Sequence, residues 1–175
     1  MGNPKRKSYG LKHGFISGNS KLYSRKCFGY KHNKDGKLII DEEQAEIVRT
    51  IFDLYLGGFS IVLIIRELVR RNIKSPQGKD TWSKLGIQTV LTNEKYVGHV
   101  LLGKTYDGDF PNNRQRKNHG EKEQYLKKDA HEPIIELERF EQVQAERERR
   151  CNIEIINGQT KRKETHYSVK REKED

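Results

Sequence analysis

Three short segments with apolar residues at helical spacing follow one another between residues 41 and 93, and this pattern constrains the fold most strongly. Asp41, Ser60 and Ser83 each stand directly before one segment, where their side chains can cap the first turn of a helix. Only 33% of the 175 residues are hydrophobic, against about 45–50% in a typical globular protein. A core therefore cannot extend along the whole chain, and we expect a compact centre with polar ends.

Patterns on both sides of these helices predict small β elements. Residues 30–40 are expected to form a hairpin around an Asp-Gly pair, because glycine accepts the positive φ that such turns need. Residues 97–106 predict a strand with a partner at 124–126, and the polar stretch 107–122 between them is expected to be a loop. A last helix is predicted to end near Arg150, with three inward residues, Leu137, Phe140 and Val143.

These patterns together predict an α+β fold that is mainly α-helical, with three parts along the chain. Residues 1–27 are rich in glycine and bases and have no helical or strand period, which indicates a flexible basic arm. Residues 28–150 hold the predicted core and form the main domain. Residues 151–175 contain few apolar side chains and are expected to be a disordered polar tail.

Positive charge is concentrated in two parts of the chain rather than spread along it. The sequence has 35 lysines and arginines and 25 aspartates and glutamates, which gives a net charge of +10. Residues 1–34 hold nine bases and no acid, and residues 60–128 hold fourteen bases and seven acids. Clustered positive charge is typical of proteins that bind a phosphate backbone, because each neutralised phosphate releases counterions. This favours a nucleic-acid partner over the plain alternative, a charge that serves solubility alone.

The cysteines and the apolar runs indicate where such a protein acts. Cys27 and Cys151 lie 124 positions apart, which gives neither a disulfide framework nor the spacing of metal ligands. No apolar run approaches the roughly 20 residues that span a bilayer, and no secretory signal follows the basic N-terminus. We therefore expect a cytoplasmic protein without a membrane partner.

No motif for catalysis, cofactor binding or metal binding is found in the sequence. A P-loop, a dinucleotide fingerprint, an HExxH motif and a GxSxG motif are all absent. The six histidines are scattered, without a pair at i,i+4 spacing. The acids of residues 41–46 stand in the first turn of a helix, where capping and the helix dipole explain them. We therefore expect no catalytic residue, cofactor or metal, and no enzyme activity from this chain alone.

The helices predicted at 60–72 and 83–93 are typical of a helix-turn-helix, although the loop 73–82 between them is long for that motif. The polar face of the second helix can pair with base edges in a major groove, glutamine and asparagine with adenine and lysine with guanine. A hairpin that follows would act as a wing. The alternative is an ordinary small α-helical domain with polar outer faces.

From these patterns we expect double-stranded DNA to be the partner, contacted by the arm, the two helices and the loop between them. Arginines of the first helix would contact phosphates, and polar residues of the second helix would face the bases. The predicted DNA-binding residues are Lys5, Arg6, Lys7, Arg25, Lys26, Arg70, Arg71, Lys79, Ser83, Lys84, Gln88, Thr89 and Asn93.

Four segments, which together cover about residues 28–150, resemble the recombinase domain of the large serine recombinases. They occur in one order with plausible spacings and read FGYKHNKDGKLIIDEEQAEIVRTIFDLYLGG, SIVLIIRELVRRNIKSPQG, WSKLGIQTVLTNEKYVGHVLLGK and HEPIIELERFEQVQAERERR. The resemblance implies a DNA-binding recombinase domain over 28–150. It also implies a function in recognising the attachment site where a mobile element of a bacterium or phage is integrated or excised.

The resemblance further implies parts that this chain does not contain. Members of the family begin with a catalytic domain that carries a serine nucleophile, so no serine of this chain is expected to be catalytic. They continue into a zinc ribbon with paired cysteines, toward which residues 151–175 would lead. Residues 1–27 would be the linker from the catalytic domain, along the minor groove. Contacts with other recombinase subunits would use the domains outside this chain.

Two other classes of protein stay open from the residues alone. One is a complete winged-helix transcriptional regulator, which would need its own dimerising surface. The other is a basic RNA-binding protein, in which Tyr9, Tyr23 and Tyr30 could stack on unpaired bases. Binding to duplex DNA, single strands and structured RNA at matched salt would distinguish the three.

Overall fold

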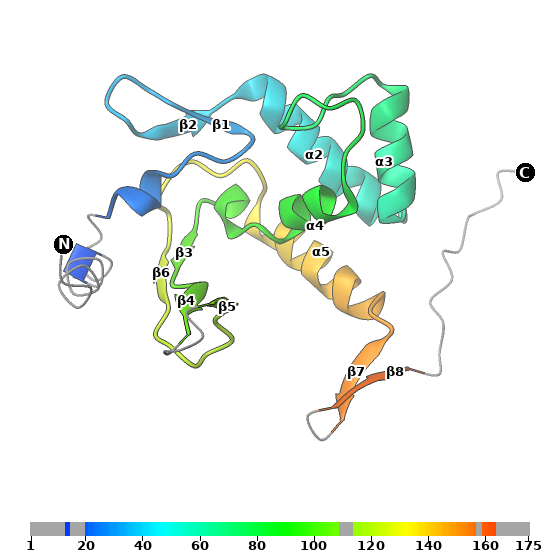
Figure 1. Ribbon diagram of the computed structural model, residues 1–175. Coiled ribbons are helices and arrows are strands. Elements are labelled where there is room, and N and C mark those ends of the chain that lie inside the picture. The colour runs from blue at the N-terminus through cyan, green and yellow to red at the C-terminus, as the bar shows by residue number, and fades with distance from the viewer. Residues whose placement is uncertain (1–12, 15–19, 109–113, 157–158, 164–175) are drawn as a thin grey trace, which may run out of the picture. The chain divides into compact units, whose positions relative to one another are not determined.

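The computed structural model describes residues 13–14, 20–108, 114–156 and 159–163 (Figure 1). The chain divides into two compact units, each built from two separate stretches of the sequence. Unit 1 comprises residues 1–41 and 94–133, and unit 2 comprises residues 42–93 and 134–175. The chain therefore passes between the units three times.

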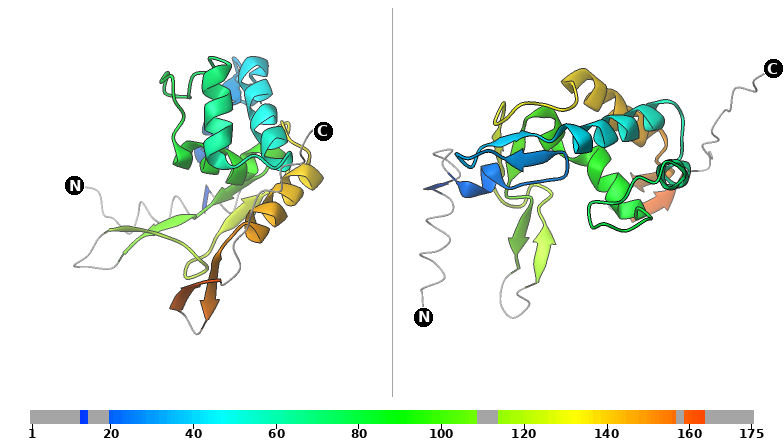
Figure 2. Two further views of the ribbon diagram at one scale, coloured as in Figure 1. Left: turned by 90° about the vertical axis from the view of Figure 1, so that its right-hand side faces the viewer. Right: turned by 90° about the horizontal axis from the view of Figure 1, so that it is seen from above.

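The described part of unit 2 is built on four α-helices: α2 (Glu42–Leu56), α3 (Ile61–Arg70), α4 (Lys84–Thr92) and α5 (Leu137–Arg149). Two of the predicted caps are confirmed. The Ser60 hydroxyl accepts from the backbone N–H of Leu63 at 3.3 Å, and the Ser83 hydroxyl accepts from that of Gly86 at 2.9 Å. Each cap satisfies an N–H group for which the helix itself offers no acceptor. α2 and α3 pack side by side (Figure 2).

The core of unit 2 takes one apolar stripe from each helix. The Phe52 and Phe140 rings join α2 to α5, with their centroids 6.2 Å apart. The prediction that Leu137 faces inward is wrong: as the first residue of α5 it is 50% exposed, and the inward stripe begins one turn later. The buried apolar residues of the helices are Ala45, Val48, Ile51, Phe52, Tyr55, Ile64, Leu68, Ile87, Val90, Leu91 and Val143.

The described part of unit 1 includes short antiparallel strand pairs and two 3₁₀ helices, η1 (Lys21–Ser24) and η2 (Glu94–Val97). The predicted hairpin at 30–40 is confirmed, and the Asn33 side-chain oxygen holds its turn by accepting from the N–H groups of Asp35 and Lys37. The pairs are β1 (Tyr30–His32) with β2 (Leu38–Ile40), β3 (Val100–Leu102) with β6 (Tyr125–Lys127), and β4 (Thr105–Asp107) with β5 (Gln115–Lys117).

Tyr30 is the centre of the core of unit 1. Its side chain is fully buried, and its hydroxyl lies 2.8 Å from the carbonyl oxygen of Glu132 and 3.1 Å from that of Lys95. The Tyr96 ring stacks on it at 6.4 Å, and the His131 ring meets it edge-on at 4.7 Å between centroids. Because all these partners come from the second stretch of unit 1, Tyr30 ties the first hairpin to that stretch.

The strand predicted over 97–106 is wrong as a single element, because the chain turns at Gly103. This residue has a φ of 78°, and a Cβ atom there would stand 2.7 Å from the carbonyl oxygen of Glu123. Only glycine fits such a position. β3 ends before it and β4 begins after it, and Val97 belongs to η2 instead.

The stretch 107–122, predicted to be a loop, contains β5 and a turn that Asn118 organises. The Asn118 amide nitrogen donates to the carbonyl oxygens of Gly103 at 2.7 Å and Lys122 at 2.8 Å. Its side-chain oxygen accepts from the N–H groups of Gly120 at 3.0 Å and Lys122 at 3.1 Å. One buried side chain thus satisfies four backbone groups, which leaves no trace in the apolar pattern of the sequence.

Both ends of the chain depart from the expected irregular structure where they are described. β7 (Ile153–Ile156) pairs with β8 (Gln159–Arg162), so the prediction of a disordered tail is wrong for these residues. Most of the predicted arm lies outside the described residues, but its last part forms η1, where the Ser20 hydroxyl accepts from the N–H of Leu22 at 3.3 Å. Across the described ranges, no helix is both long and apolar enough to cross a membrane.

Candidate nucleic-acid interface

α3, α4 and the loop between them carry the positive charge of unit 2 (Figure 1). Residues 60–93 include six arginines and lysines and two acids, a net charge of +4. By contrast, α2 has one base and four acids. Because α3 packs on α4, the basic residues belong to one continuous part of the unit. A cluster of one sign attracts a polyanion.

α4 buries one face and leaves the other in solvent. The predicted inward residues Ile87, Val90 and Leu91 are at most 4% exposed. Lys84 is the only charge on the helix, so its outer face is polar but largely uncharged. The exposed residues of the cap and the first two turns are Ser83, Lys84, Leu85, Gln88 and Thr89.

Three predicted DNA-binding residues of α4 have partners in the helix itself. The Ser83 hydroxyl is the cap, and the Thr89 hydroxyl donates to the carbonyl oxygen one turn back at 2.8 Å. Asn93 is the C-terminal cap and is partly buried. Lys84 and Gln88 stand four residues apart and therefore share one face of the helix. These two are the long polar side chains of the exposed face.

The two predicted arginines of α3 share a carboxylate. Arg70 donates to Glu67 at 2.6 and 2.8 Å, and Arg71 donates to it at 2.7 Å. The hydrogen bonds from Arg70, then those from Arg71, lower the pKa of Glu67 to about 2. Glu67 is therefore ionised at neutral pH and offsets part of the positive charge of α3. Sequence reasoning missed this partner, although the i,i+3 and i,i+4 spacing was a usable signal.

Trp82 holds the loop between α3 and α4 against the unit. Its side chain is 2% exposed, and its indole N–H donates to the carbonyl oxygen of Ile73 at 3.2 Å. A turn between Ser75 and Lys79 is closed by backbone and side-chain hydrogen bonds of 2.8 and 3.1 Å. Lys79, a predicted DNA-binding residue, is exposed on this ordered turn.

The predicted arm residues belong to unit 1. Arg25 and Lys26 follow η1 and are exposed. The Lys95 ammonium group donates to the backbone carbonyl of Arg25, which holds the chain there while the Arg25 side chain stays at the surface. The predicted set is thus divided between the two units, and three of its members lie outside the described residues: Lys5, Arg6 and Lys7.

The β4–β5 hairpin of unit 1 carries cations of the stretch 107–122, which the sequence predicts to be a loop. Arg114, Arg116 and Lys117 are all exposed on or beside β5. Lys122 adds a fourth, with its ammonium 5.7 Å from the centre of the Tyr106 ring. The signal in the sequence was the run of bases itself, because these strands bury too little apolar surface to have a readable period.

The side chains of these surfaces have hydrogen-bonding groups that fit a nucleic acid. Guanidinium and ammonium groups donate to phosphate oxygens, and the Gln88 carboxamide both donates and accepts, as an adenine edge requires. Among the described residues, no three histidine, cysteine or acidic side chains come together as metal ligands would.

Comparison with known proteins gives the class of this chain. Residues 42–150 match the model of a protein family described as Recombinase. A structure described as a crystal structure of an LSR–DNA complex has 24% sequence identity and a TM-score of 0.52, over 82% of this chain and 40% of that chain. A structure from work on the sequence requirements of the Listeria innocua prophage attP site has 23% identity and a TM-score of 0.50, over 78% and 52%.

The family match covers more than half of the chain, and the similar folds extend across both units. The chain therefore belongs to the Recombinase family. It spans about half or less of the solved chains that it matches.

Proposed function

We propose that this chain is a DNA-binding portion of a large serine site-specific recombinase and recognises the attachment site of a mobile element. The observation that carries the proposal is the exposed face of α4, where Lys84 and Gln88 stand opposite a buried apolar stripe. A helix of this kind has the shape and the hydrogen-bonding groups for a major groove. Membership of the Recombinase family and the likeness to an LSR–DNA complex support the same function.

In this proposal α3 and α4 work as a helix-turn-helix. Gln88 pairs with an adenine and Lys84 with a guanine, and the β4–β5 hairpin serves as the wing. Arg70, Arg71 and Lys79 contact phosphates, which sets affinity and orientation but not sequence. Further contacts between α4 and DNA come from Ser83, Thr89 and Asn93.

The proposal also assigns functions to the segments on both sides of the domain. Residues 1–27 are a basic arm along the minor groove, beside a DNA-binding domain over residues 28–150. Arg25 and Lys26, exposed at the described end of the arm, contact phosphates there. Residues 151–175 lead toward a zinc ribbon. Strand cleavage, strand joining and contacts between subunits belong to other domains of a longer recombinase that acts in the cytoplasm.

Fluorescence anisotropy with the full 175-residue chain tests the binding. The probes are duplexes that the chain selects from a random pool, scrambled duplexes, single strands and structured RNA. We expect the selected duplex to bind most tightly, and its affinity to fall by about 10³-fold or more between about 50 and 200 mM salt. Equal or tighter binding to RNA or to single strands would overturn the proposal.

Supercoiled DNA that carries a selected site tests the separation of binding from catalysis. After incubation with the chain, we expect intact DNA and no covalent protein–DNA adduct on a denaturing gel. A serine-linked adduct would place strand cleavage in this chain and contradict the proposal.

A further inference from the structure

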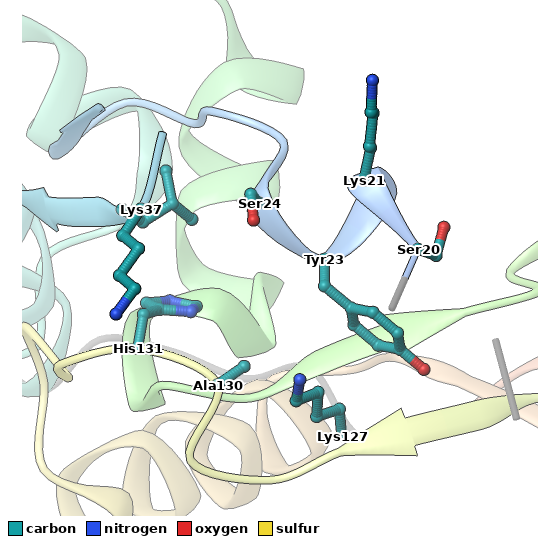
Figure 3. A pocket seen from close by; sticks show the side chains of 9 residues that line it. Ser20, Lys21, Tyr23, Ser24, Lys37, Lys127, Ala130 and His131 are labelled. Atoms are coloured by element: carbon teal, nitrogen blue, oxygen red, sulfur yellow. The ribbon is translucent and has the colours of Figure 1, made fainter. Parts of the chain in front are cut away.

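A cavity of about 480 Å³ opens in unit 1 between η1, β2 and β6 (Figure 3). Ligand sites typically have volumes of about 300–1,000 Å³. Lys21, Lys37 and Lys127 line the cavity together with His131 and two serines, and none of its lining residues is acidic. The lining of the cavity therefore includes three lysines and no acidic residue.

His131, which lines this cavity, has a hydrogen-bonding atom without a partner within the described part of the chain. Its Nε2 lies 2.7 Å from the carbonyl oxygen of Lys95, which can only accept, so Nε2 carries the hydrogen. Its Nδ1 is buried and has no partner within the described part of the chain. A buried polar atom without a partner is costly, and such atoms in folded proteins call for an explanation. A ligand that reached this atom would supply the partner.

The lysines reach the cavity from different elements. Lys37 directly precedes β2 and Lys127 ends β6. Figure 3 shows the Lys37 side chain extending toward the His131 ring, whereas Lys21 points away from it. The Lys127 ammonium lies 5.0 Å from the centre of the Tyr23 ring, which holds it at the wall of the cavity. Positive charges gathered in this way repel one another unless an anion enters.

We propose that this cavity binds a phosphate group, and that the phosphate is one of the DNA backbone, a source that rests on the proposed function. Lys37 and Lys127 neutralise its charge and donate to its oxygens. His131 takes up a proton from solvent and donates from Nδ1, because the oxygens of a phosphodiester only accept. Phosphate binding in the cavity is thus coupled to protonation of the His131 ring.

The surroundings of His131 favour the neutral form of its ring. Burial lowers the pKa of His131, and the positive charges of Lys95 and His99 act in the same direction against the hydrogen bond to the Lys95 carbonyl. A phosphate within about 4–6 Å would raise this pKa by about one unit or more. The other titratable or charged groups around the ring are Tyr30, Lys37 and Lys127.

Nuclear magnetic resonance of ¹⁵N-labelled histidine rings in the full chain tests the proposal. The pH titration is recorded without ligand, with inorganic phosphate, and with bound duplex, at an ionic strength held constant with chloride. We expect the pKa of His131 to rise by about one unit or more with each phosphate source. Signals of single rings are required, because the chain has six histidines and an affinity measured against pH would mix them.

Charge-matched variants locate the effect. Lys37→Gln and Lys127→Gln are expected to remove most of the rise in the pKa of His131. Lys34→Gln and Lys128→Gln delete the same charge from exposed neighbours that do not line the cavity. In these two variants the rise in the pKa of His131 is expected to remain. A rise that survives both cavity variants, or that all four variants reduce equally, would overturn the cavity as the site.

Anisotropy of the duplex in the same samples separates this inference from the proposed function. If the duplex binds while the pKa of His131 stays at its ligand-free value, the cavity inference fails and the proposed function stands. If inorganic phosphate raises the pKa but no duplex binds, the phosphate site stands and the proposed function fails. If the duplex binds but only inorganic phosphate raises the pKa, the assignment to the DNA backbone is overturned.

Discussion

Arginines serve opposite purposes in two helices of unit 2. Arg150 directly follows α5 and is 11% exposed, and it donates to the carbonyl oxygens of Phe59 at 2.8 Å and Tyr55 at 2.9 Å. It also donates to Glu146 at 2.5 Å and lies over the Tyr55 ring. Its guanidinium group therefore donates to one carbonyl group in the last turn of α2 and to one just after that helix. This arginine is part of the fold.

The arginines of α3 lie in solvent instead. Arg70 is 71% exposed and Arg71 44% exposed, and the carboxylate they share, Glu67, stands on the same helix. All three residues of these ion pairs lie within five positions of the sequence, so the pairs are local to α3 and its C-terminal cap. The difference teaches that a count of charges along the sequence does not measure the charge offered to a partner, because a buried guanidinium adds to the count and not to the surface.

The largest effect is expected for the residue that keeps the α3–α4 surface together. Replacing the buried ring in Trp82→Ala should lower the free energy of unfolding by about 3–5 kcal/mol, because a large cavity replaces packed atoms. Trp82→Phe keeps most of the ring volume and should cost less. Denaturant unfolding measures both. An unchanged stability together with lost DNA binding would mean that Trp82 works at the DNA surface.

The second-largest loss of stability is expected for Arg150→Ala. This variant leaves the carbonyl oxygens of Tyr55 and Phe59 and the Glu146 carboxylate without this donor. We expect a loss of about 2–4 kcal/mol in the free energy of unfolding. Arg150→Lys keeps the charge but not the planar guanidinium group, and should recover only part of the lost stability. Arg149→Ala, at a side chain that is 59% exposed, is the control and should change little. Equal effects at positions 149 and 150 would contradict the structural role.

Gln88→Ala tests whether the exposed face of α4 contacts bases. It removes no charge, so affinity for scrambled duplex should stay nearly unchanged, while preference for the selected duplex should fall by about 1–3 kcal/mol, or roughly five- to 150-fold. Paired titrations at one salt concentration measure the ratio. Gln142→Ala makes the same replacement at an exposed position of α5 and should leave it unchanged. An unaltered ratio in Gln88→Ala would show that α4 is not the reading helix.

The smallest effect concerns the carboxylate between the α3 arginines. Glu67→Gln should raise the affinity for selected and scrambled duplexes alike by about two- to fivefold at low salt, because it releases Arg70 and Arg71 toward phosphates. Glu141→Gln removes the same charge from an exposed position of α5 and should have less effect. Equal gains from both variants would indicate long-range charge alone.

Glu67 also gives a pH dependence with a definite sign. Its pKa of about 2 lies below the ordinary value of 4.5, so its ion pairs add to stability above about pH 4.5 and are lost as the pH falls toward 2. Carboxylate titration by nuclear magnetic resonance measures this value directly. A pKa near 4.5 would mean that the arginines are not held by Glu67 in solution.

The helices of unit 2 could be predicted because local signals agree there. Ser60 and Ser83 stand directly before apolar stripes of helical period, so capping and burial point to the same boundaries. The exposed face of α4 followed from the same period, since whatever the buried stripe leaves out must face solvent. Lys84 and Gln88 were therefore placed correctly on an exposed face, and whether they contact DNA stays a prediction.

The structural features that could not be predicted depend on contacts between residues far apart in the sequence, or on single polar side chains. Arg150 binds carbonyl groups 91 and 95 residues earlier, and no local pattern reports such a contact. Asn118 shapes its loop with four hydrogen bonds instead of a buried apolar stripe. The cavity at His131 joins residues from separate stretches of unit 1, so its lysines were individually visible in the sequence but their meeting was not.

The three passages of the chain between the units have a consequence for binding strength. Residues 41 and 42, 93 and 94, and 133 and 134 are direct neighbours in the sequence, so the units share three covalent junctions instead of one linker. A ligand long enough to meet both units, once held by one, finds the other at a high effective concentration. Modest contacts in each unit can then multiply into tight attachment, and a single backbone cut at one junction leaves the units joined by the other two.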